Sequence, residues 1–168
     1  MLRLKEFNLV DIKEEYEALQ QIPSQNGFEN DYYGCSFDEF KERYAKELID
    51  NSKGINLKPG YVPGTCYFLW DDDKIVGLFK IRHELNDALR NGAGHVGYAI
   101  IEKYQGLGYA SRGLELAVEV CNNLIKEDEI YFSVYKSNVA SLKVQQNNGA
   151  VIVNEDEEEY YTRIKLKR

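Results

Sequence analysis

The segment GHVGYAIIEKYQGLGYA, from Gly94 to Ala110, contains the pattern that decides the fold of this chain. Its first part, 95–101, is short, apolar and rich in β-branched and aromatic residues, which predicts a buried strand. A turn with two glycines, Gly106 and Gly108, follows, and a helix is expected to begin at Tyr109. A strand that passes through a glycine turn into a helix leaves the first amides of that helix without partners.

This predicted helix start favours an anionic ligand. Free backbone N–H groups and the positive end of the helix dipole attract phosphate without a basic side chain. Gly106 and Gly108 let a ligand approach the backbone and permit turn dihedrals that other residues avoid. A glycine pair is also ordinary in a tight turn, so the pattern alone leaves both a plain turn and a phosphate site open.

Two better known phosphate-binding patterns do not fit this turn. The dinucleotide fingerprint needs a third glycine and a preceding βαβ opening, and neither is present around 105–110. A Walker loop needs Gly-Lys-Ser or Gly-Lys-Thr, which does not follow the turn. An unrelated phosphate-binding α/β domain therefore stays open only as an alternative that rests on the turn alone.

Outside this segment, apolar periodicity predicts a mixed domain of hairpins and helices. Further strands are expected near 2–9, 65–70, 75–82, 130–134, 151–153 and 160–166. Helices are expected at 11–21, 36–54, 109–126 and 139–147. The second of these has a marked start, since Ser36 and Glu39 form a capping box, and Gly54 is suited to end it. The element order predicts one α+β or mixed α/β domain, 1–168.

Composition excludes several classes of protein. The 168 residues, 43% of them hydrophobic, suit a single domain with a sizeable core. With 28 acidic and 21 basic residues the net charge is -7, which argues against nucleic acid as a partner. No stretch approaches the roughly 20 apolar residues of a membrane span, and no secretory signal is recognised. Three cysteines without CxxC spacing indicate neither a disulfide framework nor a zinc site, so a reducing cytoplasm is expected.

The glycine turn resembles the central motif of the GNAT N-acetyltransferase superfamily. That motif reads Gln or Arg, two residues, Gly, one residue, then Gly or Ala, and it is matched in register by Gln105, Gly108 and Ala110. A second family signature, an Asn-x-x-Ser helix start, is matched by Asn138 and Ser141 at the usual separation. More narrowly, IRHELN at 81–86 followed by GAGHVGY is similar to a bacterial subgroup described as predicted acetyltransferases.

The resemblance implies an acyl-CoA N-acyltransferase fold, with a central, mostly antiparallel mixed sheet of about seven strands flanked by about four helices. It implies transfer of an acetyl group from acetyl-CoA to an amine of a small molecule or peptide, by direct attack, with no metal. The pantetheine arm is expected to enter between the strands at 95–101 and 130–134 like an added strand. This architecture commonly forms homodimers. The expected donor-binding residues are Ile100, Ile101, Gln105, Gly106, Leu107, Gly108, Tyr109, Ala110, Asn138 and Ser141.

His95 is the first candidate for the general base. It stands where many family members carry a glutamate, and its ordinary pKa near 6.5 suits proton transfer at neutral pH. Strand alternation leaves open that its ring faces away from the site. Many relatives protonate the leaving thiolate with a tyrosine four residues after the serine, where this chain has Gln145. That role is expected to fall to Tyr135, another tyrosine or water.

The acceptor is expected to lie under the loop 23–35, whose aromatic residues occupy the region that covers the acceptor in the family. Phe28, Tyr32 and Tyr33 are candidates for its pocket, with ordinary core packing as the alternative. His83 is a further candidate contact. The negative net charge weakly favours a cationic amine. Because of the glutamine at the usual tyrosine position, an acyl-CoA-binding module with little or no turnover is the alternative function.

Overall fold

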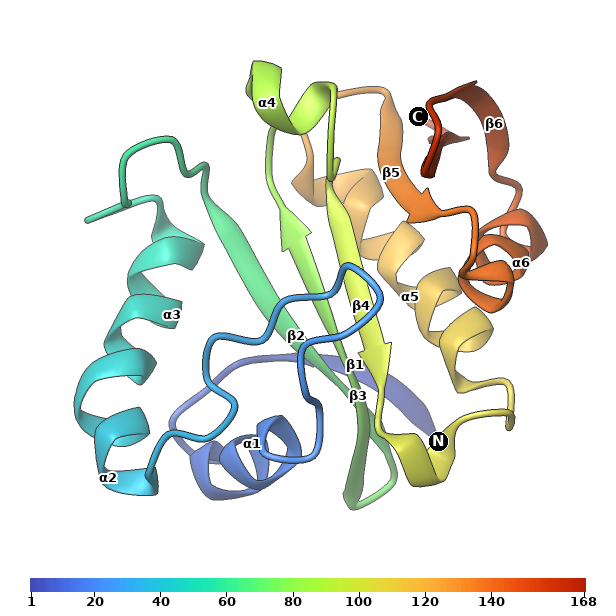
Figure 1. The fold of residues 1–168 in the computed structure, drawn as a ribbon. Coiled ribbons are helices and arrows are strands. Elements are labelled where there is room, and N and C mark those ends of the chain that lie inside the picture. The colour runs from blue at the N-terminus through green and yellow to red at the C-terminus, as the bar shows by residue number, and fades with distance from the viewer.

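The computed structural model describes residues 1–168 and contains seven strands in two antiparallel sheets (Figure 1). The first sheet has the order β1-β2-β3-β4, and the second has the order β5-β7-β6. The strands of the first are Leu2–Glu6, Gly64–Asp71, Lys74–Arg82 and Val96–Ile100 in chain order. Those of the second are β5 Glu129–Tyr135, β6 Val151–Glu155 and β7 Glu159–Lys165. The expected strands are confirmed, and they are divided between two sheets.

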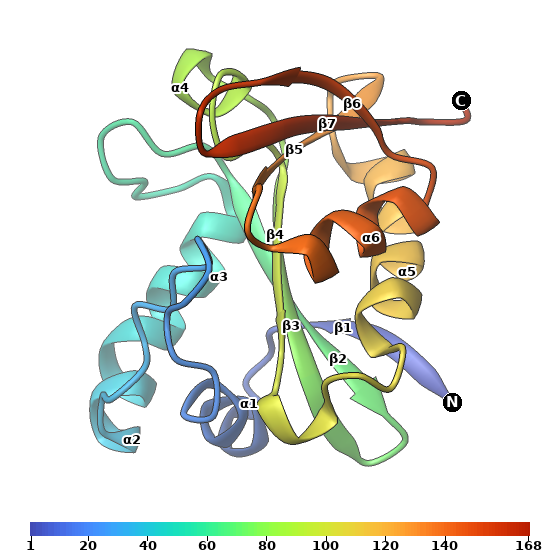
Figure 2. The same ribbon diagram turned by 45° about the vertical axis from the view of Figure 1, so that its right-hand side comes forward.

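Helices cover both faces of the first sheet (Figure 2). Helix α5 packs on β1, β3 and β4, whereas α1 packs on β3 and α3 packs on β2 from the other side. The segment α2 runs through a π-helical stretch directly into α3, as one continuous helix. None of the helices has the length and apolar character needed to cross a bilayer. The helices are α1 Ile12–Leu19, α2 Phe37–Glu39, α3 Ala45–Lys53, α4 Asp87–Arg90, α5 Tyr109–Leu124 and α6 Val139–Asn147.

The helix ends follow from local chemistry. The Oγ of Ser36 accepts a hydrogen bond from the Glu39 amide at 3.1 Å, as a capping residue should. Gly54 ends α3 in the left-handed conformation, with φ of 71°. The single-turn helix α4 was not expected from the sequence. Its cap is Asn86, whose Oδ1 accepts from the Leu89 amide at 2.9 Å.

Two hydrophobic clusters lie on opposite faces of the first sheet. The cluster under α5 includes Leu114, Ala117 and Cys121, all with no solvent exposure, as the helical periodicity predicts. Burial raises the pKa of the Cys121 thiol to about 12, so this cysteine is a packing residue at neutral pH. The cluster under α1 and α3 is rich in aromatic rings, such as Phe40 and Phe68.

The two sheets meet at only one end, where the chain enters β4. Gly94 forms an isolated bridge with Phe132 of β5, and the His95 amide donates to the Tyr131 carbonyl at 2.7 Å. Only glycine fits here, because a Cβ on residue 94 would lie 2.1 Å from that carbonyl oxygen and φ is +70°. Beyond this junction β4 and β5 form no ladder, which leaves an opening between the sheets.

Candidate active site

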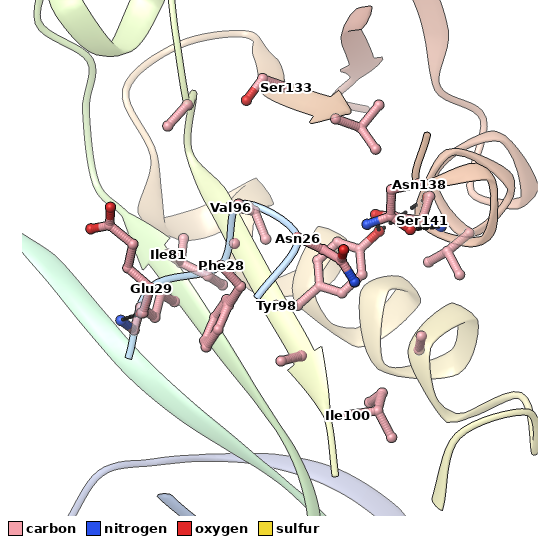
Figure 3. A pocket seen from close by; sticks show the side chains of 18 of the residues that line it. Asn26, Phe28, Glu29, Ile81, Val96, Tyr98, Ile100, Ser133, Asn138 and Ser141 are labelled. Atoms are coloured by element: carbon pink, nitrogen blue, oxygen red, sulfur yellow. Dashed lines mark hydrogen bonds between the residues drawn. The ribbon is translucent and has the colours of Figure 1, made fainter. Parts of the chain in front are cut away.

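A cleft of about 910 Å³ occupies the opening between the two sheets. It extends from the start of α5, past β4 and the end of β5, to the loop before α2, the start of β2 and the end of β3. Figure 3 shows side chains from these separate segments facing one space. Its volume lies within the range of small-molecule and cofactor sites.

At one end of the cleft the glycine turn presents free main-chain amides. Gly106 and Gly108 have φ of +77° and +85°, and Gly108 is the N-cap residue of α5. None of the amides from Gly106 to Ser111 donates a hydrogen bond within the protein. The basic residues of the cleft, Lys80 and Arg82, lie on β3 and face its other end. Backbone amides and the helix dipole therefore supply the positive potential at the turn.

Most of the residues expected at the donor end line this cleft. Two do not. Leu107 is 62% exposed and does not line the cleft, and Ile101 is buried in the aromatic cluster with its amide donating to the Val76 carbonyl at 2.9 Å. Neither side chain is placed to contact a ligand in the cleft. The expected residues that line it are Ile100, Gln105, Gly106, Gly108, Tyr109, Ala110, Asn138 and Ser141.

Gln105 has a bracing role in this geometry. Its Nε2 donates to the Ile100 carbonyl at 3.0 Å, which ties the end of β4 to the turn. The turn is thereby held across the mouth of the opening between β4 and β5. The Ile100 carbonyl thus already accepts one hydrogen bond within the protein.

The start of α6 forms the opposite wall. The Asn138 Oδ1 accepts from the Ser141 amide at 3.2 Å, so Asn138 caps this helix while its side chain also lines the cleft. The Ser141 Oγ lies 2.8 Å from the Tyr98 hydroxyl, a contact across the cleft from β4 (Figure 3). Sequence reasoning overlooked Tyr98. The signal was its position two residues before Ile100, which places both side chains on the same side of the strand.

His95 is fully buried and lies outside the cleft. Its Nδ1 accepts from the Tyr131 amide at 2.9 Å, and this bond places the ring proton on Nε2, which donates to Glu127 Oε1 at 2.9 Å. Burial lowers the pKa of His95, and the hydrogen bond to Glu127 opposes that effect. The prediction of a general base at His95 is wrong, because both ring nitrogens are engaged and neither can reach a substrate.

The expected tyrosine position on α6 is closed to acid chemistry. Gln145 is 2% exposed, and its Oε1 accepts from the Thr162 Oγ1 at 2.7 Å. Tyr135, proposed from the sequence to replace it, lines the cleft at the end of β5 and is 37% exposed. Its ring lies against Gly27 of the opposite loop. The assignment of Tyr135 as an acid stays a prediction.

At the other end of the cleft, the aromatic residues of the loop 23–35 lie in different environments. Phe28 lines the cleft, with the Lys80 Nζ 5.0 Å from its ring centroid. Tyr32 also lines it, but its ring packs against Tyr44 at 5.1 Å between centroids, and the residue is buried. Tyr33 is exposed and lies outside. The expectation for Tyr33 is therefore wrong.

His83 is also outside the cleft. Its Nε2 lies 2.7 Å from the Thr65 Oγ1, and its amide donates to the Pro63 carbonyl at 2.9 Å. Burial lowers the pKa of His83, so the ring is mostly neutral at pH 7. These contacts make His83 a brace between β3 and the loop before β2, and the expected acceptor contact is not found.

The charges of the acceptor end are mixed. Lys80 and Arg82 stand on one side of β3, while Glu29 and Asp31 are exposed on the loop above them. Glu159 lines the cleft near Tyr135, its cross-strand neighbour. None of these residues was predicted from the sequence. Because both signs are present, the net charge of the chain does not select a cationic acceptor.

Sequence comparison gives a family for the whole arrangement. Residues 2–151 match the model of the acetyltransferase (GNAT) domain. A search of curated protein sequences finds no match.

Solved structures of similar fold cover nearly the whole chain. A ribosomal L7/L12 alpha-N-protein acetyltransferase, solved with coenzyme A, is 15% identical with a TM-score of 0.72, over 98% of this chain and 94% of that one. A ribosomal-protein-S5-alanine acetyltransferase from Vibrio fischeri is 19% identical with a TM-score of 0.70, over 98% and 92%.

A third similar structure was solved with two ligands. It is a spermidine N-acetyltransferase from Vibrio cholerae in complex with CoA and spermine, 18% identical with a TM-score of 0.64, over 98% of this chain and 95% of that one. At such identities these likenesses support the fold. The family match over residues 2–151 establishes that the chain belongs to the acetyltransferase (GNAT) domain family.

Proposed function

We propose that this protein transfers the acetyl group of acetyl-CoA to an amine of a small molecule or peptide, by direct attack in a ternary complex. The observation that carries this proposal is the continuity of the cleft. One end offers free amides at a helix start, and the same space reaches an aromatic, mixed-charge pocket under the loop 23–35. A two-substrate enzyme needs both ends within one space.

The donor end suits a pyrophosphate followed by an extended arm. The amides of Gly106 to Ser111 would hold the phosphates, and the arm would enter the opening between β4 and β5. There it would pair with main-chain groups of β4 beyond the Gly94 junction, as an added strand pairs with a sheet edge. Asn138 and Ser141 would flank the arm from the start of α6.

The acceptor end suits an amine that approaches from the loop side. Phe28 supplies an apolar wall, Glu29 and Asp31 are exposed carboxylates along the cleft, and Glu159 is a half-buried one. Such groups can take the proton of an arriving ammonium, directly or through water. The three thiols of the chain are free, which fits a reducing cytoplasm as the setting of the reaction.

A second function is favoured by one observation, the presence of Gln145 at the position where relatives carry a proton-donating tyrosine. If nothing replaces that tyrosine, the protein binds acetyl-CoA and turns it over slowly. The two functions share the donor site and differ in the release of thiol.

The test combines binding with turnover. A thermal-shift titration with acetyl-CoA should raise the melting temperature, because the ligand binds only the folded state. A panel of amines, including polyamines, amino acids and peptides, should then reveal amine-dependent release of free thiol. No shift at millimolar acetyl-CoA would refute the donor site. A shift without thiol release across the panel would favour the binding module.

A further inference from the structure

The departing thiolate needs a proton, and the usual helix position cannot supply one in this chain. We propose that the Tyr98 hydroxyl donates this proton, so that the general acid stands on β4 and not on α6. This inference rests on the proposed function and concerns the chemistry of the same site. It differs from the sequence-based expectation, which named Tyr135.

The geometry places the Tyr98 hydroxyl inside the cleft at a fixed point. Its oxygen lies 2.8 Å from the Ser141 Oγ and donates to the Ser141 carbonyl at 3.2 Å (Figure 3). The ring is stacked on Phe79, with centroids 5.3 Å apart and 20° between the planes. The hydroxyl therefore spans the opening from β4 to the start of α6, which is where the reactive end of the arm would pass.

Gln145, the residue at the usual tyrosine position, affects the pKa of the Tyr98 hydroxyl. Since its Oε1 is occupied by the Thr162 hydroxyl, its NH2 group is the part that is free to turn toward Tyr98. Burial raises the pKa of Tyr98, and hydrogen bonds with Ser141 and Gln145 oppose this rise. The phenol therefore stays protonated at neutral pH and has polar neighbours to stabilise it when it ionises.

Tyr135 is held less well for this task. It also lines the cleft, but its hydroxyl makes no hydrogen bond within the protein, and the residue is 37% exposed. A proton donor works best when its geometry is fixed before the reaction. Of the two tyrosines, Tyr98 meets this condition.

The proton balance closes without any further reactant. The amine nitrogen forms a bond to the thioester carbon, the C–S bond breaks, and its electron pair goes to sulfur. Sulfur takes the proton of the Tyr98 hydroxyl and becomes the free thiol. The proton lost by the attacking nitrogen returns to the phenolate through the Ser141 hydroxyl and water, so the products are the amide and CoA thiol.

The first experiment is Tyr98→Phe, which keeps the ring that stacks on Phe79. With acetyl-CoA and the best amine, kcat should fall about 100-fold or more, the size expected for a lost general acid. The shift in melting temperature caused by CoA should stay unchanged. Tyr131→Phe is the matched control, because that hydroxyl accepts from Arg90 Nη1 outside the cleft and its loss should leave kcat unchanged.

The second experiment changes the leaving group. An acetyl thioester of an aryl thiol with a low pKa departs without protonation, so it should restore Tyr98→Phe to within a few fold of the wild type. Packing damage would not be corrected in this way. Unchanged kcat in Tyr98→Phe, or an equal defect with both donors, would overturn the proposal, and a large loss in Tyr135→Phe alone would return the role to Tyr135. A wild type that binds acetyl-CoA but releases no thiol would instead overturn the proposed function.

Discussion

The two ends of the cleft are built in different ways. The phosphate-binding part of the donor end comes from one continuous segment, 94–124, and presents main-chain amides at a helix start. The acceptor end is assembled from side chains of the loop 23–35, β2, β3 and β7, which are distant in sequence. A site made of backbone can be identified from a short motif, whereas a site made of converging side chains requires the tertiary structure.

The hydrophobic clusters behind the two ends differ as well. The buried polar residues His95, Gln145 and Thr162 all have hydrogen-bond partners. The cluster on the acceptor side has two polar neighbours with no or little exposure, Glu15 and Asn30. Asn30 is satisfied, since its Nδ2 donates to the Leu19 and Ile22 carbonyls at 2.9 and 2.7 Å. Glu15 is not, because its Oε1 has no partner. Stability on the acceptor side should therefore depend on pH.

The junction at Gly94 joins the two sheets that enclose both ends of the cleft, so disrupting it should have the largest effect on stability. Gly94→Ala should destabilise the protein by about 3 kcal/mol or more, because the new Cβ meets the Tyr131 carbonyl and the φ is strained. Urea denaturation measures the difference. Gly149→Ala is the control, since φ there is +89° but nothing lies within 4 Å. Equal losses in the two variants would show that the contact between the sheets is unimportant.

The buried carboxyl of Glu15, whose Oε1 has no partner, should give the next largest effect. Burial raises its pKa from 4.5 to about 8, with Asp11 and Glu14 adding to the rise and the Asn8 amide and Lys5 opposing it. The native state thus retains a proton that the unfolded state releases. Stability should be highest below pH 4.5 on this account and should fall as pH rises toward 8.

Glu15→Gln removes this dependence. Between pH 5.5 and 8 the wild type should lose on the order of 2 kcal/mol more than the variant, as measured by urea denaturation. Glu17→Gln, an exposed position on the same helix, should keep the wild-type profile. Parallel pH profiles for wild type and Glu15→Gln would contradict the assignment.

The donor end can be tested through the backbone. Gly108→Ala should raise the KM for acetyl-CoA about 10-fold, because a Cβ at φ of +85° strains the turn and occupies space beside the free amides. The KM for the amine should not change. Gly34→Ala carries similar strain at φ of +89° outside the cleft. If both variants alter the donor KM alike, the effect comes from stability alone.

The acceptor end should show the smallest effect, since many side chains share it. Phe28→Ala should raise the KM for the amine about 3- to 10-fold and leave that for acetyl-CoA unchanged. Tyr33→Ala is the control, because that neighbouring ring is exposed and outside the cleft. An increase in the donor KM in Phe28→Ala would show that the two ends are not separate.

The contrast also explains how far the sequence could predict the structure. The strand, turn and helix of the donor end were expected within one or two residues of their bounds, because their signals are local. The face of β4 that carries His95 was not predictable. One side of the strand carries Val96 and Tyr98, and the other carries Gly97 and Ala99. Neither side is clearly polar, so the alternation of side chains could not indicate which side faces the cleft.

Long-range contacts decided the remaining differences. Tyr32 and Tyr33 are adjacent and alike, and only the packing of Tyr32 against the helix formed by α2 and α3 makes one buried and the other exposed. The short helix α4 depends on Asn86, whose Nδ2 also donates to the distant Gly60 carbonyl at 2.9 Å. No window of local sequence contains these partners.

The free amides at the start of α5 affect which residues of this turn can be substituted during evolution. Every residue except proline carries the same N–H group, so Leu107, Tyr109 and Ser111 can be replaced without loss of the donors they present. Only the glycines of the turn are tied to their identity, through φ of +77° and +85°. A site of this kind tolerates wide divergence, which agrees with a shared fold among structures only 15% and 19% identical to this chain.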